Sequence, residues 1–109
     1  MKYHTTKTDK EMEHINRVEL QGTAGSVRSN AGMTLIPLAT SRAFTSREGI
    51  PVIETTWHRV VAKGELPFKK GDFLNVKGMI RTSRFISSSG EGQVIHEVLA
   101  QEIRRVENR

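Results

Sequence analysis

Apolar and polar residues alternate in several stretches of the chain, and this period of two is typical of half-buried β-strands. Residues 1–14 lack any hydrophobic period and are expected to form a flexible arm. Order is expected to begin at Ile15. Val18 and Leu20 then alternate with charged neighbours until Gly22 ends the run, which predicts a first strand at the edge of a sheet.

Two longer strands are predicted in the middle of the chain. Residues 33–41, preceded by a possible short strand near Val27, are apolar, and Pro37 implies an edge position or a bulge because it lacks an amide donor. Residues 52–63 form the clearest strand, since they are rich in β-branched residues. Period two places Thr56, His58, Val60 and Ala62 on its core face and Thr55, Trp57, Arg59, Val61 and Lys63 on the opposite face.

The C-terminal half continues this pattern. Residues 64–71 form a connector, residues 73–84 a strand with Leu74, Val76 and Ile80 on one side, and residues 87–92 a hairpin loop. Residues 93–106 fit either a helix or a strand by their apolar spacing. The preceding strands and the short Gly-rich turn favour the strand.

Five main strands at short spacing, with no long helix, predict one all-β domain, a small barrel over residues 15–106. Residues 107–109 form a short charged tail. Lys and Arg outnumber Asp and Glu by 17 to 12, and the net charge of +5 favours a polyanionic partner. The chain has no cysteine for disulfides or thiolate metal sites, and the lack of a long apolar run or a secretory signal favours a cytoplasmic protein.

Three aromatic residues are each expected beside cations. The groups are Trp57 with Arg59 and Lys63, Phe44 in a loop with Arg42 and Arg47, and Phe85 at a strand end with Arg81 and Arg84. This combination is typical of proteins that hold single-stranded nucleic acid, because bases stack on rings, at roughly 1–3 kcal/mol each, while cations follow the phosphates. An ordinary core position is the alternative for Phe44 and Phe85. It is less expected for Trp57, whose neighbours on the same strand face are charged.

The histidines do not indicate catalysis. His58 lies on the expected core face, where a hydrogen-bonded core or interface histidine is favoured. No two histidines have metal-ligand spacing, no carboxylate pair is placed for acid–base chemistry, and the glycines match no phosphate-binding fingerprint. We therefore expect a non-enzymatic protein with no cofactor and no metal.

Several motifs together resemble one known family. The most specific is TTWHRVV at residues 55–61, followed by Gly64. Other matching motifs are INRV at residues 15–18, LATS at residues 38–41 with an aromatic three places later, and a strand that ends on an aromatic at Phe85. These motifs resemble the bacterial single-stranded DNA-binding proteins, and the resemblance covers roughly residues 15–98.

The resemblance implies a five-stranded OB-fold barrel that assembles as a homotetramer and coats single-stranded DNA in replication, recombination and repair. The stacking residues that it implies are Trp57, Phe44 and Phe85. The implied DNA backbone contacts are Arg59, Lys63, Arg81 and Arg84, to which we add the nearby cations Arg42 and Lys77. The expected subunit-interface residues are His58 by resemblance, and Val18 and Leu20 on the predicted edge strand.

The chain departs from the family pattern in several places. Lys63 stands where the family often has an aromatic residue, residues 65–70 are too short for the family's usual helix, and the loop after Gly22 is shortened. The end of the sequence is neither long nor acidic. Recruitment of repair enzymes through an acidic tail is therefore not expected.

Three alternatives remain open at this point. The short length also fits primosomal replication protein B, a dimeric OB-fold relative. The chain also fits an RNA-binding OB-fold module, or a scaffold subunit whose basic face binds an acidic protein. Mass in solution, comparison of DNA with RNA, and salt-dependent binding to poly-dT separate these functions.

Overall fold

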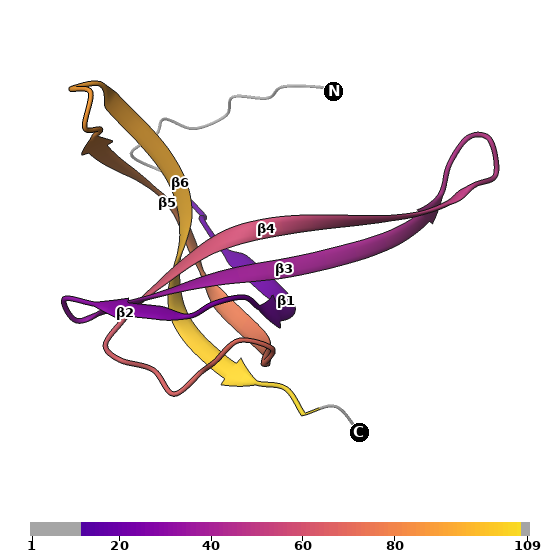
Figure 1. Cartoon of the computed structure of the whole chain (residues 1–109), viewed down its shortest axis with the longest axis horizontal. Helices are drawn as coiled ribbons and strands as arrows, with labels where there is room; N and C mark the ends of the chain where they lie inside the picture. The colour runs from indigo at the N-terminus through magenta and orange to yellow at the C-terminus, as the bar shows by residue number, and fades with distance from the viewer. Residues whose placement is uncertain (1–11, 108–109) are drawn as a thin grey trace.

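The computed structural model describes residues 12–107, which contain six strands and no helix. The strands are β1 (Val18–Ala24), β2 (Arg28–Asn30), β3 (Met33–Thr45), β4 (Pro51–Lys63), β5 (Phe73–Ile86) and β6 (Gly92–Arg105) (Figure 1). This confirms the all-β prediction. Residues 1–11 of the predicted arm and residues 108–109 of the predicted tail lie outside the described residues.

The strands close into a barrel. Their order is β1-β5-β6-β4-β3-β2, and β1 also pairs with β3 through Thr23 and Ala24, so that β1, β3, β4, β6 and β5 form a closed ring. The β4–β6 pairing is parallel and the other pairings are antiparallel. β2 is a short extra strand paired with β3 outside the ring. A closed, mixed barrel of five strands is the OB-fold arrangement, so the predicted fold class is confirmed.

The barrel interior holds an apolar core, and two glycines allow its strands to approach one another closely. Its buried residues are Ala24, Ile36, Leu38, Val60, Leu74, Val76 and Val98. Glycine is required at two close approaches between strands, because a Cβ at Gly22 would overlap the carbonyl oxygen of Ala39 and a Cβ at Gly78 would overlap that of Leu99. Gly22 therefore lies inside β1, where it crosses β3, and the prediction that it ends the strand was wrong.

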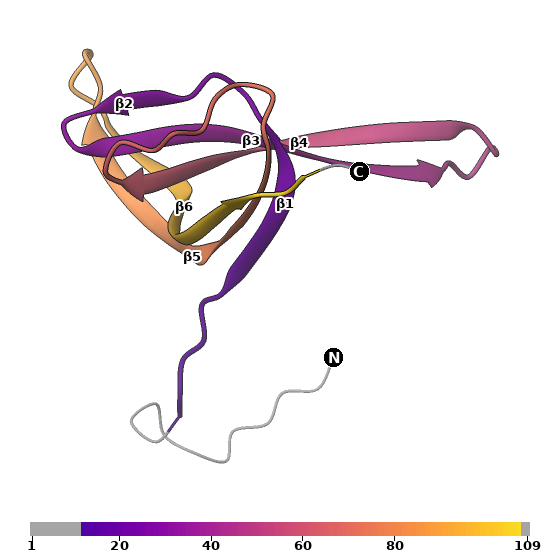
Figure 2. The same ribbon diagram turned by 90° about the horizontal axis from the view of Figure 1, so that it is seen from below.

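A long two-stranded arm projects from the barrel. β3 and β4 stay paired as far as Thr45 and Pro51, and a turn at residues 46–50 closes the arm (Figures 1 and 2). The sequence predicted an end of β3 at Ser41 and a loop around Phe44. The predicted strand was too short and the predicted loop was wrong, because Phe44 pairs with Val52 and lies within β3.

A β-bulge accounts for the ambiguous pattern of the last strand. The register between β5 and β6 shifts at Lys77/Gly78 and leaves Gln101 of β6 unpaired. An extra residue reverses which side chains of a strand point inward. Val98 before the bulge and Ile103 after it accordingly both pack on the core, although they are five positions apart. The favoured prediction of a strand over residues 93–106 is confirmed.

Two further details of β3 and β5 bear on the predictions. Pro37 lies where the neighbour of β3 changes from β2 to β1, which is compatible with its missing amide donor. Ile80 has the same inward parity as Leu74 and Val76 but is 49% exposed, because β5 extends beyond the packed core at that point. Of the three residues predicted to share one side of this strand, only Leu74 and Val76 are buried.

Candidate nucleic-acid interface

A hollow on the outer surface of the barrel gathers cations from several strands. It encloses about 400 Å³. Its lining comes from β2, β3, β4, β5 and β6: Arg28, Asn30, Met33, Thr34, Leu35, Arg59, Val61, Arg81, Ser83 and Glu97. We call it the basic groove. Parallel pairing of β4 with β6 and antiparallel pairing of β6 with β5 bring these distant segments side by side.

The floor of the basic groove is an ion-pair cluster. Glu97 is 5% exposed, and its Oε1 accepts a hydrogen bond of 3.1 Å from Arg59 Nε while its Oε2 accepts one of 2.7 Å from Arg81 Nε. Burial raises the pKa of the Glu97 carboxyl, but the hydrogen bonds and charges of the two arginines outweigh burial and leave that pKa below its ordinary value. Glu97 is therefore a carboxylate at neutral pH.

Trp57 stands beside this cluster on the same face of β4. It precedes Arg59 by two residues, and its side chain is 63% exposed. Gly25 leaves room for the ring, since a Cβ there would lie 3.1 Å from Trp57 Cζ3 and 3.4 Å from Pro37 Cβ. The chain thus holds a large aromatic ring at the surface next to a basic groove. The predicted outward position of Trp57 is confirmed, whereas its stacking role stays a prediction.

Phe44 and Arg42 lie on the other face of the β3–β4 arm. The register pairs Phe44 with Val52 and Trp57 with Ala39, and strand alternation puts these two pairs on opposite faces. The Arg42 guanidinium lies 4.6 Å from the centroid of the Phe44 ring. Arg42 also donates from Nε to Glu54 at 2.9 Å. The structure therefore does not bring this pair together with Trp57.

The remaining candidates Phe85, Arg84 and Lys63 lie in three different places. Phe85 alternates in phase with Arg81 and Ser83 and is 41% exposed, so it continues the groove face toward the β5–β6 hairpin. Arg84 lies one position out of phase and points to the opposite face. Lys63, at the end of β4, lines a different hollow beside the connector residues Leu66, Pro67 and Phe68.

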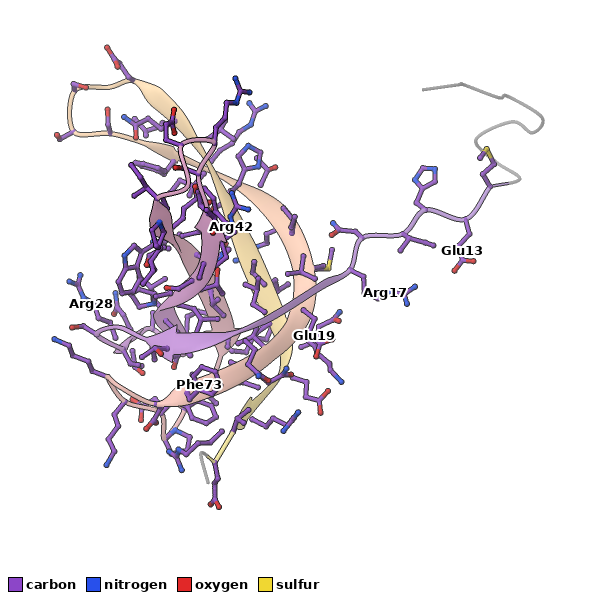
Figure 3. All side chains as sticks on the ribbon, turned by 90° about the vertical axis from the view of Figure 1, so that its right-hand side faces the viewer. Glu13, Arg17, Glu19, Arg28, Arg42 and Phe73 are labelled. Atoms are coloured by element: carbon purple, nitrogen blue, oxygen red, sulfur yellow. The ribbon has the colours of Figure 1, made fainter. Side chains whose placement is uncertain are left out.

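Lys77 lines a second groove on the outer surface, where the charges are balanced. This groove encloses about 560 Å³ and is lined by Arg17, Val18, Glu19, Lys77, Gly78, Gln101 and Glu102. We call it the mixed-charge groove. Figure 3 shows Glu19 and Arg17 on one side of the barrel and Arg28 of the basic groove on the other. The structure therefore separates Lys77 from the cluster of Arg59 and Arg81.

The expected subunit-interface residues occupy different environments. Val18 and Leu20 are half-buried and pack against the barrel core, so their side chains point inward. His58 is half-buried, and its Nε2 shares a hydrogen bond of 2.8 Å with the Thr40 hydroxyl. The backbone of β1 pairs with β5 along Val18–Thr23 but meets β3 only at Thr23 and Ala24, which leaves one edge of β1 open before the crossing.

Sequence reasoning missed two charged residues of the basic groove. In the sequence, Glu97 cannot be distinguished from a solvent-exposed charge, because the arginines that contact it come from β4 and β5, far away along the chain. Arg28 adjoins the possible short strand predicted near Val27 and was not singled out as a site residue. A carboxylate within a β-rich apolar run is the available signal for Glu97, and no signal distinguishes Arg28.

The described residues contain neither a metal-binding cluster nor a membrane-spanning helix. Among residues 12–107, no group of three or more His, Cys, Asp or Glu side chains is placed to hold a metal ion. Within the same residues, no helix is long and apolar enough to cross a membrane.

The fold and the basic groove together define a class of protein, the OB-fold barrels with a cationic outer surface and an exposed tryptophan. No family model matches the chain. A single-stranded DNA-binding protein of Xylella fastidiosa is 30% identical over 107 residues, which cover 87% of this chain and 65% of that protein. One of Bacteroides thetaiotaomicron is 32% identical over 98 residues, which cover 77% of this chain and 61% of that protein. The chain is thus a homologue of proteins named single-stranded DNA-binding protein and spans less than two thirds of their length.

Solved structures agree on the fold. The SSB of Plasmodium falciparum in its complex with ssDNA has a TM-score of 0.72 at 18% identity, covering 89% of this chain and 99% of that one. A deletion variant of the single-stranded DNA-binding protein from Thermus aquaticus has a TM-score of 0.71 at 24% identity, covering 87% and 52%. The solved structures confirm the barrel fold, and the two homologous sequences confirm the resemblance found in the motifs.

Proposed function

We propose that this protein binds single-stranded DNA without sequence preference and does no chemistry on it. The observation that carries this proposal is the exposed Trp57 ring beside the basic groove of Arg28, Arg59 and Arg81. An aromatic platform takes up unstacked bases, whereas guanidinium groups hold the phosphates between them. A duplex does not offer free base faces, so the same surface favours single strands.

The binding path that we propose runs along one face of the barrel. Trp57 stacks on a base, Arg59 and Arg81 contact the phosphates that follow, and Phe85 provides a second ring toward the β5–β6 hairpin. Lys63 extends the path at the connector end. Phe44 and Arg42 form a separate contact on the opposite face of the arm, which a strand reaches only by crossing its edge.

Self-assembly is part of the same proposal. The open edge of β1 and the exposed β3–β4 arm supply backbone and apolar surface for a second copy. We propose a homo-oligomer, with a tetramer favoured over a dimer, and a role in replication, recombination or repair in the cytoplasm. Light scattering tests the assembly, and a monomer at micromolar concentration contradicts it.

The function is tested by fluorescence anisotropy with three labelled ligands of equal length: oligo-dT, oligo-rU and duplex DNA. We expect oligo-dT to bind best and its affinity to fall with salt, with a log–log slope of about −0.7 per neutralised phosphate. Tighter binding of oligo-rU would identify an RNA module instead. Displacement of oligo-dT by polyglutamate at low concentration would favour a scaffold that binds acidic proteins.

A further inference from the structure

Glu97 carries a negative charge into the centre of a surface that otherwise attracts anions. The lining of the basic groove contains three arginines, Arg28, Arg59 and Arg81, and one carboxylate. That carboxylate lies at the floor, 5% exposed, below arginine side chains that are 44% and 39% exposed. A phosphate that approaches the arginines therefore meets an anion already bound to both of them.

The contact geometry distinguishes Glu97 from the other paired carboxylates among residues 12–107. Glu54 and Asp72 each contact one arginine, Arg42 and Arg105 respectively, whereas Glu97 uses one oxygen for each of two arginines. Each arginine contacts Glu97 through Nε, and a large part of its side chain stays exposed. Glu97 thus fixes both side chains and cancels one of their two positive charges.

We propose that Glu97 is a positioning residue that sets the charge of the basic groove, so that the Arg59–Glu97–Arg81 cluster presents one net positive charge rather than two to a single strand. This inference rests on the proposed binding of single-stranded DNA. A lower groove charge means fewer counterions exchanged on binding, and therefore a weaker dependence of affinity on salt. It also keeps a coating protein removable, because an internal anion competes with each phosphate for the arginines.

The test compares Glu97→Gln with the unmodified protein. Glutamine keeps the size of the side chain and one acceptor oxygen but raises the cluster charge by one. We expect tighter binding of oligo-dT at low salt and a log–log salt slope steeper by about 0.7, so that the affinity ratio between about 50 and about 200 mM salt grows about 2.6-fold.

A matched control uses the same chemical change elsewhere on β6. Glu102 lies just beyond the bulge, in the mixed-charge groove, where Lys77 faces it in the register. Glu102→Gln adds the same charge to the whole protein. We expect it to leave the salt slope unchanged, because single strands pass on the other side of the barrel.

A second pair of variants keeps the inference testable if Glu97→Gln does not fold. Arg81→Gln leaves the cluster neutral, and Arg81→Gln combined with Glu97→Gln leaves it with the one charge of Arg59. The double variant should show a salt slope steeper than that of Arg81→Gln by about 0.7. A purely structural role for Glu97 predicts no such restoration.

An unchanged or flatter slope in folded Glu97→Gln, or in the double variant relative to Arg81→Gln, overturns the inference. Circular dichroism at the binding temperature establishes that each variant is folded. Failure of the proposed function looks different, because the unmodified protein would then not bind oligo-dT at any salt concentration. A steeper slope in every comparison made with folded variants, with Glu102→Gln unchanged, supports the role of Glu97.

Discussion

The two grooves on the outer surface of the barrel differ in charge balance far more than in size. The basic groove encloses about 400 Å³ and sets three arginines against Glu97. The mixed-charge groove encloses about 560 Å³ and sets Arg17 and Lys77 against Glu19 and Glu102. The basic groove therefore has an excess of positive charge that the mixed-charge groove lacks. The placement of charge, rather than its total, marks the side on which a polyanion is expected to bind.

Aromatic exposure follows the same division. Trp57, at 63% exposed, lies two positions before Arg59 on the same face of β4, beside the lining of the basic groove, whereas among residues 12–107 no aromatic residue lines the mixed-charge groove. Charge alone attracts any polyanion, and only the addition of a ring favours unstacked bases. The comparison of the grooves therefore separates general attraction from selectivity for single strands.

The largest effect is expected from loss of the tryptophan ring. Trp57→Ala should weaken binding of oligo-dT by roughly 1–3 kcal/mol, because a stacked base loses its platform. Phe73→Ala removes a partly exposed ring at another hollow, beside Asp72 and Arg105, and serves as the control. Anisotropy titration of both variants checks this, and equal losses in the two would contradict a specific platform at Trp57.

Acidification is expected to lower the free energy of unfolding, by an amount similar to or smaller than the loss of binding free energy in Trp57→Ala. The pKa of Glu97 is lower in the folded protein than its ordinary value, so its ion pairs contribute their full stability above that ordinary value. The contribution is lost as the pH falls through the folded-state pKa, below about 4.3, at a cost of roughly 1–3 kcal/mol. Urea unfolding between neutral and acidic pH measures it.

Glu97→Gln provides the comparison for the acid effect. Its free energy of unfolding should be lower than that of the unmodified protein at neutral pH and should depend less on acidity. A parallel loss of stability with acid in both proteins would show that other carboxyl groups account for the acid effect.

Single cations of the two grooves should differ in their effect on the salt dependence. Arg28→Gln should flatten the log–log salt slope for oligo-dT by about 0.7, since Arg28 faces the proposed strand path. Lys77→Gln makes an equal change of net charge in the mixed-charge groove and should leave the slope nearly unchanged. Equal slopes for the two variants would mean that the grooves are not distinguished by the ligand.

The smallest effect is expected for Lys63. It lines the hollow under the connector rather than the basic groove, so it meets the strand only at the end of the path. Lys63→Ala should flatten the salt slope less than Arg28→Gln does, with little change in base preference. An effect larger than that of Arg28→Gln would move the path toward the connector.

Much of the barrel follows from local pattern. The β-branched run of β4 predicted its length and its two faces, and the short spacing of strands predicted the five-stranded architecture. The bulge at Gln101 was not predictable, because a reversal of inward parity mimics helical spacing in the sequence. Gly22 was misinterpreted for a related reason, since the crossing strand that requires glycine lies elsewhere in the chain.

The candidate site was only partly predictable. Trp57 and Arg59 share a strand face that period two reveals, whereas Glu97 joins Arg59 across 38 positions of sequence through the β4–β6 pairing. Phe44 lies on the face opposite to Trp57 because β3 continues past Ser41, and the sequence did not predict this continuation. Long-range register therefore determines which of the predicted cations and rings act together.

The most direct test of the central claim is the fluorescence of Trp57, the only tryptophan in the chain, during titration with oligo-dT at low salt. We expect strong and saturable quenching that added salt reverses, with no comparable change on addition of duplex DNA. Binding of oligo-dT detected by anisotropy without any change in Trp57 fluorescence would contradict the proposed platform beside the basic groove.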